Sequence, residues 1–166
     1  HRQHLYQPAD IGKDKVNVAK RSLKNISSQT KIIAFDNFLN QSNAKSCFEN
    51  IDIIIDATDN ITSKQIIDKV SKDKNIPMVY GSLYRFEGQV GVFNTNSKIG
   101  YSELFPDSIS DGKTCEEAGV VGMLPSIIGN MQALEAIKLI VNLEPNLIGK
   151  LLIYDSLQHK TEVIEL

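Results

Sequence analysis

Acidic and amide side chains crowd the end of one short apolar run, where their types suit metal and phosphate chemistry. Residues 51–60 read IDIIIDATDN, a β-branched run that ends in Asp56, Thr58, Asp59 and Asn60. The run is too short for a helix and is typical of a parallel strand covered on both faces. Ligands bind at the carboxyl ends of such strands, so the Asp59 carboxylate is a candidate Mg²⁺ ligand beside substrate phosphates. A structural interpretation also stands, in which an Asx-type turn caps the next helix.

Two cations near the start of the chain are candidate phosphate contacts. Arg2 presents a planar guanidinium that suits phosphate oxygens, and Lys15 supplies a mobile point charge. Lys15 also lies near the start of a predicted helix, where unpaired backbone N–H groups favour anions. Taken singly, each is more often a solvated surface cation. Opposite Asp59, the basic pair would equip a site for nucleotidyl transfer, in which catalysis is largely positioning and charge neutralisation.

The cysteines and histidines offer one further candidate. Cys115 lies in GKTCEEAGVVG, on a predicted loop shortly before a helix. A thiol there could act as a nucleophile if its pKa were lowered, and the alternative is an inert, partly buried thiol. Cys47 is expected to pack in the interior. The three histidines, His1, His4 and His159, show no metal-ligand spacing with each other or with the cysteines, so no zinc site is predicted.

Length and composition are those of a single globular domain. The chain has 166 residues, of which 42% are hydrophobic and 23% charged, with a net charge of −2. No block of like charges indicates nucleic acid or a membrane surface as partner, and no apolar run approaches the length of a membrane span. Two cysteines provide no disulfide framework, which favours the cytoplasm.

Hydrophobic periodicity predicts the elements that would position these side chains. Helices are expected over residues 13–25, within 39–48, over 62–74 and over 126–142. Strands are expected over residues 31–35, 51–55, 77–81, 89–93, 150–155 and 161–166, with a long irregular segment between the fourth and fifth. This order predicts an α/β fold, Rossmann-like, with a mainly parallel sheet flanked by helices and antiparallel strands at the C-terminal end.

Six motifs, in order along the chain, resemble the ThiF/MoeB/HesA family, the bacterial relatives of ubiquitin-activating enzymes. HRQ at 1–3 is similar to the end of that family's Asn-Leu-His-Arg-Gln motif, and DATDN at 56–60 to its central strand end. The other four motifs lie within residues 12–19, 81–93, 115–119 and 129–140. The resemblance therefore covers almost the whole chain.

This resemblance implies ATP-dependent adenylation of the C-terminal glycine of a ubiquitin-like sulfur-carrier protein. The carboxylate would attack the α-phosphate of ATP, and pyrophosphate would leave. By the same resemblance Arg2 and Lys15 would hold ATP phosphates, and Asp59 with Asn60 would lie at the Mg²⁺–ATP site. Cys115 would match the cysteine that in some relatives forms a covalent link to the carrier or to a sulfur donor.

The resemblance also implies partners and a domain assignment. The carrier would end in Gly-Gly and serve molybdopterin or thiamine biosynthesis, with a slight preference for the molybdopterin branch, and the enzyme would be a homodimer. The family's glycine-rich loop lies upstream of the Asn-Leu-His-Arg-Gln motif. We therefore expect residues 1–166 to be the C-terminal portion of a single adenylation domain, inactive alone. Gly100 and Glu103 stand where several relatives carry their first zinc-binding cysteine pair, so no zinc is expected.

Two other classes of function remain open. The chain could belong to a non-catalytic module that resembles the adenylating enzymes and binds a ubiquitin-like partner. The strand and helix order would also fit a dinucleotide-dependent oxidoreductase, but the chain has neither a glycine fingerprint nor a clear acid/base pair for hydride transfer.

Overall fold

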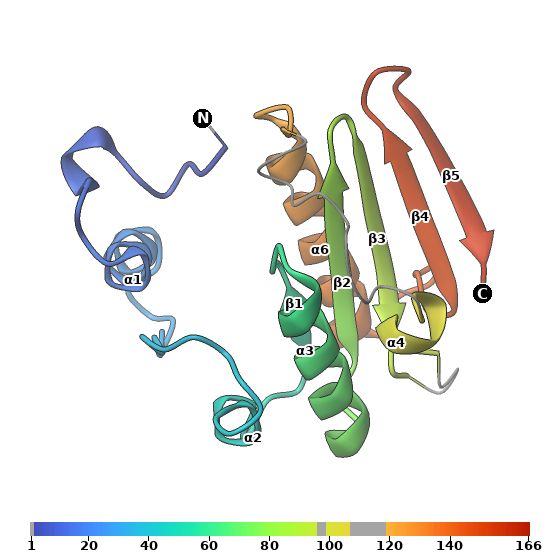
Figure 1. Ribbon diagram of the computed structural model, residues 1–166, viewed down its shortest axis with the longest axis horizontal. Helices are drawn as coiled ribbons and strands as arrows, with labels where there is room; N and C mark the ends of the chain where they lie inside the picture. The colour runs from blue at the N-terminus through green and yellow to red at the C-terminus, as the bar shows by residue number, and fades with distance from the viewer. Residues whose placement is uncertain (1, 96–98, 107–118) are drawn as a thin grey trace.

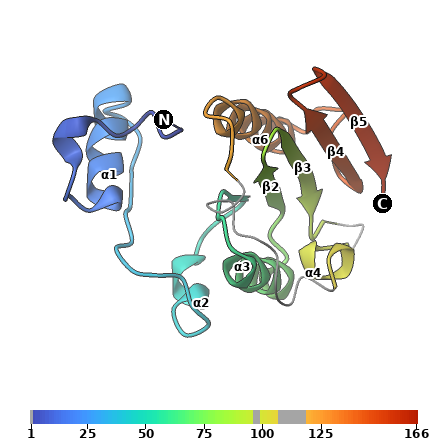
Figure 2. The same cartoon turned by 45° about the horizontal axis from the view of Figure 1, so that its top comes forward.

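The protein folds around one five-stranded sheet with helices on both faces (Figure 1). The computed structural model describes residues 2–95, 99–106 and 119–166. The strands lie side by side in chain order: β1 (Ile54–Asp56), β2 (Met78–Tyr84), β3 (Glu87–Phe93), β4 (Lys150–Asp155) and β5 (Lys160–Glu165). Residues 2–53 lie beyond the β1 edge of this sheet, so β1 is an edge strand (Figures 1 and 2).

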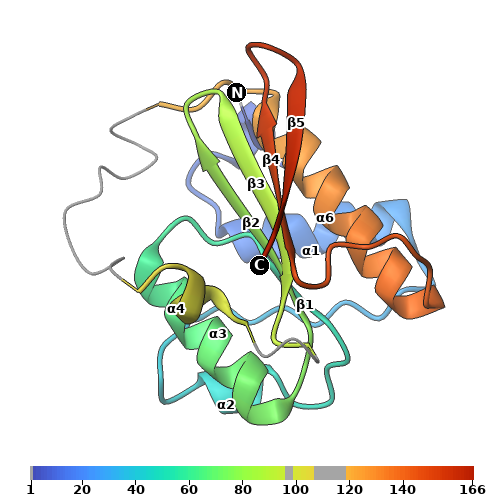
Figure 3. The ribbon, with the colours of Figure 1, turned by 90° about the vertical axis from the view of Figure 1, so that its right-hand side faces the viewer.

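The helices lie close to the predicted positions. They are η1 (Pro8–Asp10), α1 (Lys15–Ile26), α2 (Ala44–Cys47), α3 (Ile61–Lys74), α4 (Tyr101–Leu104) and α6 (Leu124–Val141). The predictions over 13–25, 62–74 and 126–142 are confirmed to within two residues at each end, and α2 falls inside 39–48. Figure 3 shows α3 and α4 on one face of the sheet and α6 on the other.

The α/β class and the antiparallel C-terminal strands are confirmed, but among the strands of the described residues only β1 and β2 form a parallel pair, with two isolated parallel bridges elsewhere. The pairs β2–β3, β3–β4 and β4–β5 are all antiparallel. The connection between β2 and β3 is only Arg85 and Phe86, and two residues can join only antiparallel strands. The α3 crossover between β1 and β2 is long enough for the parallel pair.

The predicted strand over residues 31–35 was wrong. These residues form no ladder with any described strand, although their exposure alternates as in a strand: Ile33 and Phe35 are exposed, and Ile32 and Ala34 are half-buried. Alternating β-branched residues favour extended backbone, but a strand also needs a partner for its backbone hydrogen bonds. The segment therefore has the side-chain pattern of a strand without the pairing.

Each face of the sheet has its own apolar core, because successive side chains of a strand point to opposite faces. Met78 and Tyr80 pack on the α3 and α4 side with Phe93, whereas Val79 packs on the α6 side with Val90. The two cores hold the carboxyl end of β1 between α3 and α6, and that end is where polar side chains gather.

The 18-residue helix α6 is by length and composition sufficient to cross a membrane. Core helices of soluble proteins meet the same criterion, and α6 packs against β2 and β3 through Leu124 and Ile128. It also buries Gln132 and Glu135, which bond to backbone groups of the rest of the fold. These contacts pack one side of α6 against the sheet, and 28% of the helix is buried.

Candidate functional site

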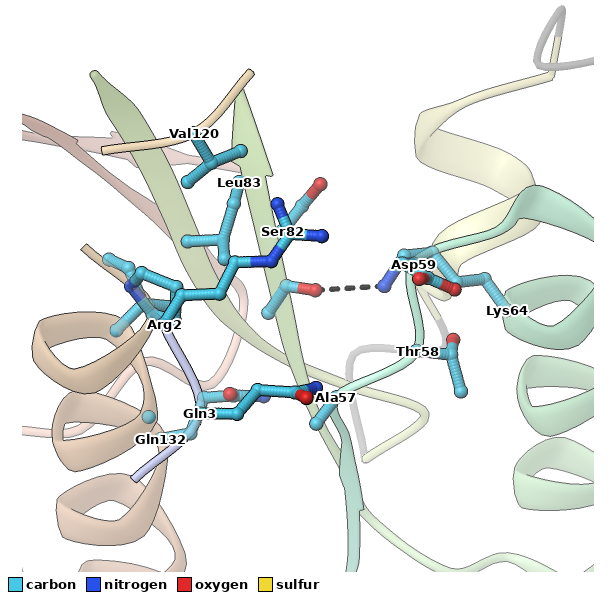
Figure 4. Close-up of a pocket in the computed structure, with 14 residues that line it drawn as sticks. Arg2, Gln3, Ala57, Thr58, Asp59, Lys64, Ser82, Leu83, Val120 and Gln132 are labelled. Atoms are coloured by element: carbon cyan, nitrogen blue, oxygen red, sulfur yellow. Dashed lines mark hydrogen bonds between the residues drawn. The ribbon is translucent and has the colours of Figure 1, made fainter. Parts of the chain in front are cut away.

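A pocket opens where β1 ends and separates from β2 (Figure 4). Its cavity volume is about 230 Å³. The polar side chains that line it are those of Arg2, Gln3, Thr58, Asp59, Lys64, Ser82 and Gln132. They come from the N-terminal segment, the β1–α3 loop, α3, β2 and α6, so distant parts of the sequence converge here. The pocket lies at the carboxyl end of parallel strands, the position predicted from residues 51–60.

The sequence left open whether the polar residues after β1 cap the next helix or bind a ligand. In the structure Asn60 caps the helix, and Asp59 is accessible to a ligand. Asn60 is the N-cap of α3, and its Oδ1 accepts a hydrogen bond from the Ser63 N–H at 2.8 Å. The capping interpretation is therefore confirmed for Asn60. The exposed Asp59 carboxylate lines the pocket, and Asn60 Nδ2 donates to its Oδ1 at 3.4 Å. Asp59 thus lies where a cation or a substrate could reach it.

The two predicted phosphate contacts separate in the structure. Arg2 lines the pocket, and its side chain extends from the N-terminal segment toward β2 (Figure 4). Lys15 is the first residue of α1, exposed and outside the pocket lining. Of the predicted residues that the structure describes, Arg2 and Asp59 are the two that line this pocket.

The N-terminal helix that carries Lys15 is fastened to the turn before it. Asp10 Oδ1 accepts hydrogen bonds from Arg21 Nη2 at 2.7 Å and from Lys13 Nζ at 3.1 Å. These two side-chain bonds, with one from the Gln7 N–H, lower the pKa of Asp10 to about 2. The contacts fix α1 against its own turn and not against the sheet.

Sequence reasoning missed three polar residues at the site. Lys64 and Gln132 were not singled out, and Asp56 was not expected to be buried. All three are buried, and Asp56 is fully so. Lys64 Nζ donates to Asp56 Oδ2 and to the Gly81 carbonyl, each at 2.8 Å, and the second bond is drawn in Figure 4. Gln132 Nε2 donates to the Asp56 carbonyl at 2.8 Å and to the Val79 carbonyl at 3.2 Å. The sequence signal was an aspartate and a lysine eight residues apart across a strand end.

Residues 99–106, which follow the β3 strand, are held to α3 through Asp68. Asp68 Oδ1 accepts from Asn94 Nδ2 and the Tyr101 N–H, both at 2.9 Å, and its Oδ2 accepts from Ser102 Oγ at 2.6 Å. Burial opposes ionisation, but the hydrogen bonds from Ser102 and Asn94 outweigh it and lower the pKa of Asp68. The helix that begins beside the pocket therefore also anchors this segment.

The remaining predicted site residues concern sulfur and zinc. Cys115 lies outside the described residues. Within residues 2–95, 99–106 and 119–166, no group of three His, Cys, Asp or Glu side chains gathers in the way that a structural zinc site needs. Glu103 instead accepts a hydrogen bond from the Gly100 N–H at 2.9 Å and pairs with Lys72, whose hydrogen bond lowers the Glu103 pKa.

Comparison with known proteins decides the family. The model of the ThiF family matches residues 1–166. The chain belongs to the ThiF family. It is 38% identical over 158 residues to a probable molybdopterin-synthase adenylyltransferase of Gracilaria tenuistipitata var. liui, and this match covers 95% of the chain and 44% of the relative. It is 34% identical over 165 residues to a sulfur carrier protein adenylyltransferase of Thermus thermophilus, covering 95% of the chain and 61% of that relative. The chain thus spans about half the length of these ThiF relatives.

Solved structures share the fold. The crystal structure of PaaA superposes with a TM-score of 0.78 at 23% identity, over 99% of the ThiF chain and 51% of PaaA. MccB of E. coli, solved with MccA-N7isoASN, gives a TM-score of 0.80 at 18% identity, over 98% of the chain and 52% of MccB. At these identities the likeness establishes the fold.

Proposed function

We propose that the protein containing this chain is an adenylyltransferase that uses ATP to activate the C-terminal glycine of a ubiquitin-like sulfur carrier. One observation carries the proposal: in a ThiF-family chain, Arg2 and Asp59 meet in one pocket at the carboxyl end of β1. The names of the two relatives described above support it. The pocket is slightly smaller than the roughly 300–1,000 Å³ typical of small-molecule sites, which suits a site that receives part of a nucleotide.

The reaction would join the carrier's terminal carboxylate to the α-phosphate of ATP and release pyrophosphate. The guanidinium of Arg2 would bind phosphate oxygens and stabilise the negative charge that develops on them. Lys15 would add a second cation to the phosphates, which requires α1 to lie closer to the pocket when nucleotide is bound. The protein would thus act by positioning and charge neutralisation.

The donor set fits Mg²⁺, which favours one or two carboxylates together with substrate phosphates. Asp59 would supply the carboxylate, because it is exposed in the pocket while the nearby Asp56 carboxylate is buried against Lys64. When bound, the ion would neutralise negative charge on the phosphates of ATP. Asn60 would support Asp59 through its amide, and its own oxygen is occupied by the cap of α3.

The carrier would be a protein that ends in Gly-Gly, and the molybdopterin branch is favoured over the thiamine branch.

We also propose a cytoplasmic homodimer. The face of α6 turned away from the sheet exposes Leu134, Ile137 and Ile140, which would be expected of a surface that another chain covers. Light scattering of the full-length protein would give the number of copies.

ATP–pyrophosphate exchange tests the proposed activity. The full-length protein should exchange labelled pyrophosphate into ATP only when a ubiquitin-like carrier ending in Gly-Gly is present. A carrier without its last two glycines serves as the control. If the carrier binds and no exchange occurs, the protein is a binding module and the proposed activity is rejected.

A further inference from the structure

Strand β1 leaves the sheet at Asp56, and its departure creates a local deficit of hydrogen bonds. In the parallel ladder Asp56 pairs with Tyr80, so Ala57 would pair with Gly81 if the strand continued. It does not, because the chain turns away at residue 57. Carbonyl groups of β2 that would have faced β1 then need other donors, since buried backbone groups are almost always paired.

Lys64 supplies the missing donor, because its Nζ donates to the Gly81 carbonyl at 2.8 Å. Gln132 Nε2 reinforces the last paired residues of the ladder by donating to the carbonyls of Asp56 and Val79. Lys64 comes from the first turn of α3 and Gln132 from α6, so the gap between β1 and β2 is closed from both faces of the sheet. We call Asp56, Lys64 and Gln132 the strand-end clamp.

Asp56 connects this clamp to the loop that carries Asp59. Its Oδ2 accepts from Lys64, while its Oδ1 accepts from the Thr58 N–H at 2.9 Å and from Thr58 Oγ1 at 2.6 Å. The carboxylate is fully buried, so its orientation is fixed by these partners. Thr58 precedes Asp59 directly, and the direction of the chain at residue 59 therefore follows from how Asp56 is held.

We propose that Lys64 is a positioning residue: through Asp56 and Gly81 it holds the 57–60 loop so that the Asp59 carboxylate faces the pocket. The expected effect of Lys64 on activity rests on the proposed adenylation. The link from Lys64 through Asp56 to the 57–60 loop does not depend on that function. Lys64 is only 5% exposed, and its ammonium is engaged by Asp56, by Gly81 and by the ring of Tyr80, whose centroid is 4.9 Å away. Those contacts distinguish it from a cation that waits for a phosphate.

Steady-state kinetics of the full-length protein separate positioning from substrate binding. Lys64→Met should lower kcat for carrier-dependent exchange by about 100-fold, the loss that a misplacement of about 1 Å can cause, with little change in the KM for ATP. Lys64→Arg should keep most of the activity, because a guanidinium can donate to both oxygens. Lys69→Met, an exposed lysine on the same helix, is the matched control and should behave as wild type. A raised KM with unchanged kcat would overturn the proposal in favour of direct ATP binding.

A second variant covers the case in which the lone Asp56 charge prevents folding. Lys64→Met combined with Asp56→Asn leaves no charge at either position and should fold, yet kcat should stay low because the hydrogen bond to the Gly81 carbonyl is lost. Recovery of wild-type kcat in this double variant would show that Lys64 serves only charge balance, and would overturn the positioning role.

Hydrogen exchange provides a readout that needs no activity. The Thr58 amide, bonded to Asp56 Oδ1, should exchange faster in Lys64→Met than in wild type or Lys69→Met. The exchange rates of the backbone amides in the β4–β5 ladder should be the same in all three proteins. If the Thr58 amide is unaffected, the clamp is rejected whatever the activity shows. If wild type fails to catalyse exchange of pyrophosphate, the proposed function is rejected and the Thr58 amide still decides the clamp.

Discussion

At the scale of single residues, the site depends on two aspartates in opposite environments. Asp56 is buried and neutralised by Lys64 at 2.8 Å, whereas Asp59 is exposed in the pocket three residues later. A buried ionised carboxylate needs a partner because its desolvation is costly, and an exposed one does not. The chain thus keeps one carboxylate for structure and leaves the other accessible to a cation.

This division predicts the effect of Asp59→Ala. The substitution removes an exposed side chain whose described contact is with the neighbouring Asn60, so thermal stability should change by no more than about 0.5 kcal/mol. Carrier-dependent pyrophosphate exchange by the full-length protein should be abolished, because the proposed Mg²⁺ ligand is lost. A fully active variant would contradict the assignment of Asp59, provided that its melting temperature matches wild type.

Cys115 belongs to a later step if it reacts at all. Adenylation needs only the carrier carboxylate and ATP, so Cys115→Ala should retain pyrophosphate exchange close to the wild-type rate. Sulfur transfer to the carrier, measured by the mass of the carrier, is the reaction that should fail if the thiol takes part. Loss of exchange itself would place Cys115 in the adenylation step.

The sequence identified the residues at the strand end but not the residues that hold them. Asp59 and Arg2 could be selected as candidates, because a polar cluster after a β-branched run and a planar cation have recognisable chemistry, and both line the pocket. From the sequence, a lysine in a helix is expected to be a solvent-exposed cation. Only the register of β1 against β2 places the Gly81 carbonyl next to Lys64. Such long-range pairing is not encoded in local spacing.

At the scale of elements, α3 joins the pocket to the segment after β3. It begins at the cap formed by Asn60, and eight residues later Asp68 accepts the N–H groups of Tyr101 and Ser102 at the start of α4. The short α4 is placed by this carboxylate together with Tyr101, which is buried in the core against the ring of Tyr80. Any displacement of α3 would therefore reach both the site and residues 99–106.

Asp68→Asn tests this link. The amide cannot accept all the bonds that the carboxylate receives, and the variant should unfold in urea with about 1–3 kcal/mol less free energy at pH 7. The lowered pKa of Asp68 means that its contribution is complete above its ordinary value of about 3.9 and is lost as pH falls through the lowered pKa. The difference between variant and wild type should therefore shrink in acid. Asp73→Asn, exposed on the same helix, should show neither effect.

The positions of helices could be predicted where an apolar pattern is long. The prediction of strands failed where the pairing of one strand with another decides whether a strand forms. The 18 residues of α6 form an apolar run too long for a strand, and the 14 of α3 carry an apolar period that indicates a helix. Residues 31–35 carry an equally good strand pattern, yet no described strand lies beside them. The same limit applies to the sheet, whose β2–β3 pair must be antiparallel because only two residues join the strands, a feature that composition does not reveal.

At the scale of the whole molecule, the edge of the sheet at β1 and the segment before it form an unprotected apolar region. Ile33 is 63% exposed and Phe38 97%, and Ile55 on the edge strand is 50% exposed. Open strand edges with apolar neighbours are templates for pairing between chains unless charges or bulges block them. In residues 1–166 alone, we expect this region to promote aggregation.

Replacing one of these side chains by lysine should slow that aggregation. We expect Ile33→Lys to lower the light scattering of residues 1–166 at a given concentration, because a charge in an apolar extended segment opposes pairing between chains. Leu157→Lys is the matched control: it adds the same charge at a side chain of equal exposure, 61% against 63%, but lies in the β4–β5 connection. If both variants reduce scattering equally, net charge is the cause and the region is not special. If only Ile33→Lys does so, and the full-length protein scatters little without any substitution, then the rest of the protein covers the segment.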